Sequence, residues 1–392
     1  SSSWPVIGSV GGGGGDGEGE GEGARGLKWD FGFPPLRDME AHAGLELHRG
    51  TALGKGSTGE VVLATARGTG QRLACKIVRK ALPKSVALPN GRSVAEQREH
   101  MRREVAVLSA LKGSLSVAQL QGVWEDEDSV YIVQELCEGG EVLSGLGPSL
   151  SERCVAHIML SVLRTVAVMH SHNVLHRDIK PGNFLFLGEG HDSPVKAVDF
   201  GIARFFDPEA LPLEGLPSEG TPWFMAPELL RKEEGPKADV WAAGVMLYQL
   251  LTGRLPFTDR RNPAKPSLSR VWRSILYDPV PCLGLGGEDP ASLKPYIADL
   301  SAEARDLLSR LLQRDPELRP TAKQALQHPF FAQLRHEGAA AASVLDPTIV
   351  QRLQAFGQKP AWKRSAMQMI AEELVGWLDG DGEEARGEAE EG

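Results

Sequence analysis

Cysteine is scarce in this chain. Four residues, Cys75, Cys137, Cys154 and Cys282, are scattered over 392 positions, and no two of them form a C-x-x-C pair. This usage disfavours a disulfide framework and indicates a reducing compartment. We therefore expect an intracellular protein, most simply a cytoplasmic one.

An excess of positive charge is also missing. The formal net charge is −9, and the two ends of the chain carry more than all of it. Residues 1–30 hold five acids and two bases, and residues 372–392 hold nine acids and one base. The remaining middle has a charge of about +2, which argues against a nucleic-acid-binding protein.

Long hydrophobic runs are absent too. The most apolar helical stretch, residues 154–169, is interrupted by His157, Ser161 and Arg164. A buried amphipathic helix is therefore favoured over a transmembrane span. No secretory signal is visible, although a sequence that starts at Ser1 would not reveal an earlier leader.

The patterns that are present divide the chain into four parts. Residues 1–44 are a Gly/Glu-rich segment and a linker, of which residues 1–26 have too little apolar surface to fold. Residues 45–331 are patterned as a folded domain, residues 332–378 as a basic amphipathic tail, and residues 379–392 as an acidic disordered tail.

Within the domain, short strands come first and helices dominate later. Strands are expected at 45–53, 60–66, 72–80, 118–124 and 130–135, a helix at 95–111, helices from 151 onward, and further short strands at 184–186 and 195–198. This order predicts an α+β protein with a small β-rich lobe, about 45–135, and a larger helical lobe, about 141–331.

A glycine loop, "LGKGSTGEVV", joins the first two strands. It comprises Gly54, Lys55, Gly56, Ser57, Thr58 and Gly59. Glycines let a backbone fold closely over phosphates and present N–H groups to them. Arg49 stands where a Walker A loop needs glycine, and a Rossmann loop would open a helix rather than a strand. The strand-to-strand form with Val61 resembles the glycine loop of protein kinases.

Lys76 lies in "ACKIV", an otherwise apolar strand, and Glu104 lies near the apolar face of the following helix. Alone, Lys76 could be an edge lysine whose ammonium reaches water, and Glu104 could be a surface acid. A Lys76–Glu104 pair would instead hold an ammonium over the α- and β-phosphates of a nucleotide.

The resemblance to protein kinases becomes specific at "HRDIKPGNFLF". This stretch matches the catalytic loop of that family, with Asp178 and Asn183 at the required spacing. The motifs "VDFG", "MAPE", "ADVW" and "DPELRP" follow in the family's order. The sequence thus resembles a eukaryotic-type protein kinase from about 46 to 331, which implies the bilobal kinase fold and the cofactors ATP and Mg²⁺.

The resemblance also implies catalytic roles. Asp178 would accept or orient the proton of the substrate hydroxyl, and Lys180 would offset charge on the γ-phosphate. Asn183 and Asp199 would ligate magnesium, a cation that prefers oxygen donors. Lys180 and the stretch "GTPWFMAPE" are similar to serine/threonine kinases, with Thr221 placed to hydrogen-bond the Asp178–Lys180 pair.

The nucleotide site is implied in the same way. Adenine would be sandwiched by Leu53, Val61, Ala74 and Leu185. Its edge would meet backbone groups of Glu135 and Cys137. Gln134 would lie at the back of the pocket, and Glu141 would meet the ribose or a basic substrate residue.

Other motif residues have structural roles in the resembled family. His176 would pack on Phe200, and Glu228 would form a buried ion pair with Arg319. Arg177 beside Asp178 is similar to kinases whose activation loop is ordered by phosphorylation, with Ser218 as the candidate site.

Finer resemblance points to plant and algal calcium-dependent protein kinases. It rests on "KWDFGF", "YIVQELCEGGEV", "RPTAKQALQHPFF" and the tail "IVQRLQAFGQKPAWKRSAMQMIAEEL". The tail is similar to that family's autoinhibitory junction, and its basic amphipathic pattern suits a calmodulin-like partner. Gly357 and Pro360 should split its helix.

Several alternatives stay open from the sequence. No credible EF-hand follows the tail, so a calcium sensor would have to come from elsewhere. The tail could also be a packing helix without a regulatory role. A pseudokinase scaffold and a kinase for small molecules are the rival functions, although Lys76, Asp178, Asn183 and Asp199 are intact. A monomer that phosphorylates proteins is expected.

Overall fold

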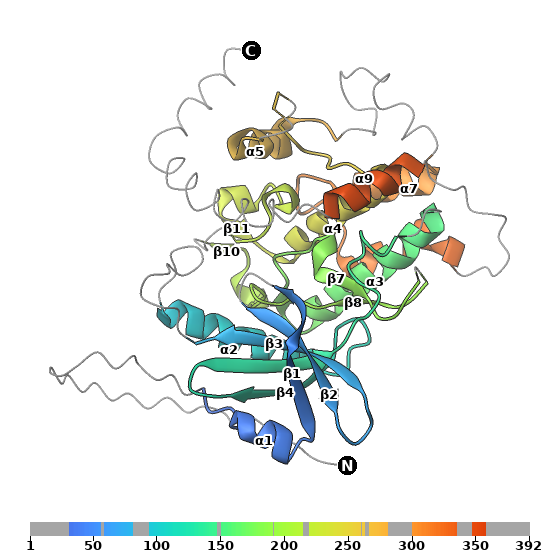
Figure 1. Cartoon of the computed structure of the whole chain (residues 1–392). Coiled ribbons are helices and arrows are strands. Elements are labelled where there is room, and N and C mark those ends of the chain that lie inside the picture. Colours follow the sequence, from blue (N-terminus) through green and yellow to red (C-terminus); the bar gives the residue numbers. More distant parts are fainter. Residues whose placement is uncertain are drawn as a thin grey trace, which may run out of the picture.

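The computed structural model describes residues 31–55, 59–80, 94–146, 150–190, 192–214, 219–259, 261–262, 266–280, 300–334 and 347–357. Two lobes are visible in Figure 1, one built on a sheet and the other on helices. The α+β bilobal prediction is confirmed.

The small lobe is a five-stranded antiparallel sheet in the order β1-β2-β3-β5-β4. Its strands are β1 (Leu45–Lys55), β2 (Glu60–Ala66), β3 (Arg72–Arg79), β4 (Leu120–Glu125) and β5 (Ser129–Glu135). Alternating apolar side chains such as Val62 and Ala64 are buried on one face, as period-two strands require. Helix α2 (Val94–Ala110) belongs to the same lobe and lies beside the sheet (Figure 1).

The small lobe begins before residue 45. Helix α1 (Leu36–Ala41) contacts β1 and β4, and its Met39 is fully buried in the cluster that also holds Trp124 and Tyr131. Residues 31–44, assigned above to a linker, are therefore packed onto the sheet.

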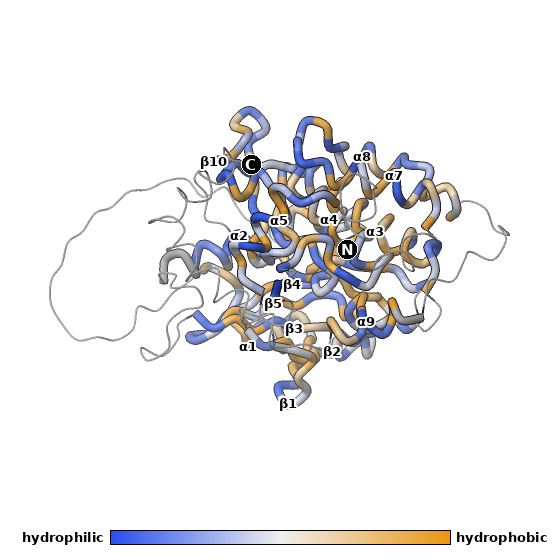
Figure 2. The backbone as a smooth tube through the Cα atoms, turned by 90° about the horizontal axis from the view of Figure 1, so that it is seen from above, coloured by the Kyte–Doolittle hydropathy of each residue, from blue (hydrophilic) through white to orange (hydrophobic). Residues whose placement is uncertain are grey.

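The large lobe is built around two long helices, α3 (Glu152–Ser171) and α4 (Pro236–Thr252), which contact each other. Helices α5 (Leu268–Tyr277), α7 (Ala302–Leu311) and α8 (Ala322–Ala325) surround them. Figure 2 shows hydrophobic and hydrophilic residues alternating along the outer helix α7, whereas fifteen of the seventeen residues of α4 are buried. Core and surface helices are thus distinguished by their patterns.

Short two-stranded ladders hold the segments around the site. They pair β6 (Val174–Leu175) with β9 (Arg204–Phe205), β7 (Phe184–Phe186) with β8 (Val195–Ala197), and β10 (Leu213–Glu214) with β11 (Glu233–Glu234).

In the part of the chain that the structure describes, one helix, α3, is long and apolar enough to cross a membrane by length and composition. Half of its most apolar window is buried inside the protein, and it contacts α4, α8 and β8. This packing is that of the core helix of a folded lobe.

Helix α9 (Pro347–Gly357) lies against the C-terminal end of α4 (Figure 1). Ile349, Val350 and Leu353 are buried in the main core. A Cβ on Gly253, the left-handed residue that ends α4, would come within 3.1 Å of the Ile349 carbonyl oxygen, so α9 closely covers this turn. The described part of the helix reaches Gly357, and the break expected at Gly357 and Pro360 lies at and beyond the edge of the described residues.

Candidate active site

Lys76 and Glu104 meet at the inner side of α2. The Nζ atom of Lys76 lies 2.6 Å from Oε1 of Glu104 and 3.5 Å from Oδ1 of Asp199. Both side chains of the pair are nearly buried, and β3 is the central strand of its sheet. Lys76 is therefore not an edge lysine, and Glu104 is not a surface acid.

The ammonium of Lys76 lies between the carboxylates of Glu104 and Asp199, and these charges shift the pKa values of the three groups. Burial by itself would lower the pKa of Lys76, but the Asp199 and Glu104 carboxylates outweigh it and raise the pKa. Burial raises the pKa of Glu104, whereas the Lys76 ammonium holds the pKa of Asp199 at about 2. Lys76 thus stays cationic and Asp199 anionic at neutral pH.

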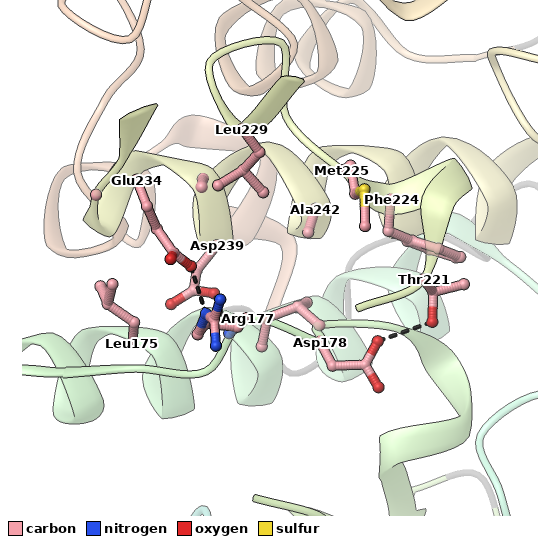
Figure 3. Close-up of a pocket in the computed structure, with 13 residues that line it drawn as sticks. Leu175, Arg177, Asp178, Thr221, Phe224, Met225, Leu229, Glu234, Asp239 and Ala242 are labelled. Carbon is pink, nitrogen blue, oxygen red and sulfur yellow. Dashed lines mark hydrogen bonds and ion pairs between the residues drawn. The ribbon is translucent and has the colours of Figure 1, made fainter. Parts of the chain in front are cut away.

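The carboxylate of Asp178 is held on both of its oxygens. Thr221 Oγ1 donates to Oδ1 at 2.8 Å, and Lys180 Nζ donates to Oδ2 at 2.5 Å and to Thr221 Oγ1 at 2.8 Å. Asn183 Nδ2 also donates to Oδ2, at 2.9 Å. Figure 3 shows Asp178 pointing toward Thr221 beside a pocket between the catalytic loop and α4.

This network keeps Asp178 ionised. Burial would raise its pKa, but Lys180, Thr221 and Asn183 together lower it. Neighbouring His176 has the opposite environment, because burial lowers its pKa and its ring lies 5.3 Å from that of Phe200. A neutral, packed His176 fits the structural role that the sequence predicted.

The residues fit a magnesium ion. Asn183 commits its amide nitrogen to Asp178, which leaves the amide oxygen as its candidate ligand atom, and the Asp199 side chain is 42% exposed. The amide oxygen of Asn183 and the carboxylate oxygens of Asp199 are hard oxygen donors. Within the described residues no cluster of three or more His, Cys, Asp and Glu could hold a metal by itself.

Three of the four side chains proposed to sandwich adenine are partly exposed, and each is followed in the sequence by a buried residue. Val61, Ala74 and Leu185 are each partly exposed, whereas the residues that follow them, Val62, Cys75 and Phe186, are buried; Leu53 is 41% exposed. Period two in strands directs these side chains away from the core of the sheet. Glu141 forms an isolated bridge with Leu185, the middle residue of β7.

The segment after β5 holds Glu135 and Cys137. The Glu135 amide donates to the Gln119 carbonyl at 2.9 Å. Gln134 is buried, and its Nε2 donates to the Ala118 carbonyl at 3.2 Å. Burial raises the pKa of the Cys137 thiol to about 12, so that thiol is not a nucleophile at neutral pH.

The glycine loop is described only at its ends. Gly54 and Lys55 end β1 and pair with Val61 and Glu60 of β2. A Cβ on Gly59 would lie 2.0 Å from the Ile77 carbonyl oxygen, so only glycine fits there. Gly56, Ser57 and Thr58 lie outside the described residues, as does Ser218.

Two acids that the sequence analysis missed surround Arg177. Its Nε donates to Glu234 at 2.5 Å (Figure 3) and its Nη1 to Glu219 at 2.6 Å. Its φ is +70°, an uncommon value for a non-glycine residue, and Asp239 of α4 accepts its amide at 2.9 Å. Two carboxylates thus pair with Arg177, whereas the phosphorylation expected at Ser218 stays a prediction, and no local pattern marked Glu219 or Glu234.

The Glu228–Arg319 ion pair braces the large lobe. Two bonds of 2.6 and 3.0 Å join the side chains, and the Arg319 side chain is 0% exposed. The guanidinium also lies 5.2 Å from the ring centroid of Trp241. Loss of one partner of such a pair costs about 3–5 kcal/mol.

A sheet lobe with a Lys–Glu pair, facing a helical lobe with an Asp-Lys-Asn catalytic loop, is the arrangement of a protein kinase. The family model "Protein kinase domain" matches residues 47–331, and the chain belongs to this family.

Curated relatives are named as calcium-dependent protein kinases. Calcium-dependent protein kinase 25 of Arabidopsis thaliana is 36% identical over 86% of this chain and 60% of its own length. Calcium-dependent protein kinases 15 and 9 of Oryza sativa subsp. japonica are 36% and 37% identical, each over 83% of this chain and over 55% and 52% of their own lengths. The chain thus spans between half and three fifths of these relatives.

Proposed function

We propose that this protein is a serine/threonine protein kinase that transfers the γ-phosphate of Mg-ATP to protein hydroxyls. The observation that carries the proposal is the closed network of Asp178, Lys180, Thr221 and Asn183, together with the Lys76–Glu104 pair and Asp199. A pseudokinase would be free to lose any of these side chains.

Each residue has a definable task. Asp178, ionised and oriented by Thr221, accepts or orients the proton of the attacking hydroxyl. Lys180 and Lys76 place positive charge where the phosphates carry negative charge. When bound, magnesium neutralises further phosphate charge, and Asn183 and Asp199 would hold it.

Substrate choice is proposed from Glu141. Glu141 bridges to Leu185 of β7, and its carboxylate suits a basic residue upstream of the target, while Gly182 stands where a second acid would strengthen that preference. A peptide array, read with wild type and Asp178→Asn in parallel, tests both proposals. Signal confined to wild type and to peptides with upstream basic residues supports them. A proline-directed or acidic preference contradicts the substrate proposal, and equal signal in both proteins contradicts the catalytic one.

The C-terminal tail is proposed to inhibit the kinase in cis, with release by a calmodulin-like calcium sensor. Support comes from the relatives' names and from the three bases Lys359, Lys363 and Arg364 in the sequence after α9. The packing alternative applies to α9, because three of its apolar side chains are buried. The inhibitory role is therefore assigned to residues 358–392.

Two truncations separate packing from inhibition. A chain ending at Gly357 keeps α9, and we expect its basal rate to rise about three- to tenfold, a typical regulatory coupling. A chain ending at residue 346 also loses the burial of Ile349, Val350 and Leu353, worth about 1.5–3 kcal/mol each, and should melt earlier. An unchanged rate in the chain that ends at Gly357 would contradict inhibition. Adding calcium and calmodulin to the full chain tests release.

A further inference from the structure

The chain enters the small lobe along the exposed edge of its sheet. We name residues 31–35 the strap. Pro35 bridges in parallel to Glu125 of β4, the edge strand, and the Glu125 amide donates to the Pro34 carbonyl at 3.0 Å. The strap thus extends the sheet beyond β4.

A nearly buried carboxylate ties the strap to the lobe. Glu125 Oε1 accepts the amide of Phe31 at 3.1 Å and that of Phe33 at 2.9 Å. Its Oε2 lies 2.5 Å from Nζ of Lys80, and both side chains are under 10% exposed. A buried carboxylate needs such partners, so strap and Glu125 depend on each other.

The ring of Phe31 connects the strap to α2. Its centroid lies 5.7 Å from Lys80 Nζ, 5.6 Å from Arg98 Cζ and 5.7 Å from Arg102 Cζ, and the Phe33 ring stacks on it at 5.8 Å. Arg98 and Arg102 are one turn apart on α2, so they lie on one face of the helix. An aromatic face attracts such cations.

Helix α2 has its functional contacts on another side. Glu104 pairs with Lys76, and His100 Nδ1 donates to the Gly201 carbonyl at 3.1 Å, next to Asp199. The position of α2 therefore decides whether the phosphate-binding lysine is aligned, and the strap holds this helix from outside.

We propose that the strap is a positioning element for catalysis, which acts through Phe31 on Arg98 and Arg102 to keep α2 where Glu104 meets Lys76. The inference rests on the phosphotransfer site proposed above. The simpler alternative is that the strap only covers the sheet edge and stabilises the lobe.

The test uses the full chain with Phe31→Leu, which keeps an apolar side chain but removes the aromatic face, and Phe31→Trp, which keeps that face. Tyr277→Leu, at a 70% exposed aromatic residue of α5, is the matched control. The measurements are kcat, KM for ATP, melting temperature and amide hydrogen exchange in α2 and α4.

We expect Phe31→Leu to lower kcat about three- to tenfold, the range that a lost cation–π contact allows, with a smaller change in KM. Amides of α2 should exchange faster while those of α4 stay unchanged. Phe31→Trp and the control should match wild type. Arg98→Gln with Arg102→Gln should reproduce the effect, and adding Phe31→Leu to them should lower kcat little further.

Unchanged kcat and α2 exchange in Phe31→Leu would overturn the proposal, and a lower melting temperature with unchanged kcat would assign the strap to edge protection. If wild type transfers no phosphate, the proposed function fails, and the exchange of α2 still decides whether the strap positions this helix.

Discussion

Arg177→Met should destabilise the large lobe by about 3–5 kcal/mol, the cost of breaking a buried ion pair. Methionine keeps much of the length of the arginine stem, so the loss is mainly one of charge and hydrogen bonds. Arg177, Glu219 and Glu234 have side chains only 4%, 13% and 7% exposed. The substitution therefore leaves two carboxylates with little water and without this cation.

The part of this destabilisation that comes from uncompensated charge can be separated from the part that comes from lost packing. Neutralising both acids in the same chain, as Glu219→Gln with Glu234→Gln, should recover part of the loss because the uncompensated charges are gone. Arg67→Met is the matched control. Its bond to Glu46 is 3.4 Å long and both side chains are about half exposed, so about 0–1 kcal/mol is expected.

Denaturant unfolding measures the free energy of unfolding of wild type, Arg177→Met, the triple variant that adds Glu219→Gln and Glu234→Gln, and Arg67→Met. A phosphotransfer assay measures the activity of the same proteins. Arg177→Met should also lose activity, since Arg177 adjoins Asp178. Phosphatase treatment of wild type should leave most activity, because carboxylates already hold the guanidinium. A loss below about 1 kcal/mol for Arg177→Met, or a triple variant no more stable than Arg177→Met, would refute the reasoning.

Four further predictions concern the site and the tail helix. Asp178→Asn should abolish nearly all turnover while ATP binding, measured by calorimetry, stays close to wild type; retained turnover would exclude Asp178 as the base. Because the pKa of Asp178 is lowered below the ordinary range of an aspartate, its ionised form persists throughout the neutral range and is lost only in acid, so kcat/KM should show no ionisation of the base above about pH 5. Gly59→Ala should raise KM for ATP, since its Cβ would overlap the Ile77 carbonyl; an unchanged KM would mean that the loop adapts freely. Leu353→Ala should cost about 2–5 kcal/mol in unfolding experiments, and a negligible cost would show that α9 is not docked in solution.

The motif spacings of the catalytic loop were readable from the sequence because they are local. Asp178, Lys180 and Asn183 lie within six residues of one another, and backbone geometry alone keeps them together. Strand periodicity likewise predicted all five strands of the small lobe to within a few residues, since an alternating apolar pattern needs one buried face.

Contacts between distant segments had no such local signal, and the pairs Lys76–Glu104 and Glu228–Arg319 were expected only from the kinase motifs. Glu219 and Glu234 read as ordinary acids, and only the fold brings them to Arg177, 42 and 57 positions away. Residues 31–35 were likewise expected to belong to a linker, and only the structure shows Glu125 and α2 packed around Phe31. The chain's own sequence thus indicated which groups form the candidate site. Tertiary structure alone decided that Glu219 and Glu234 compensate Arg177, because an ion pair depends on distance in space and leaves no periodic trace along the chain.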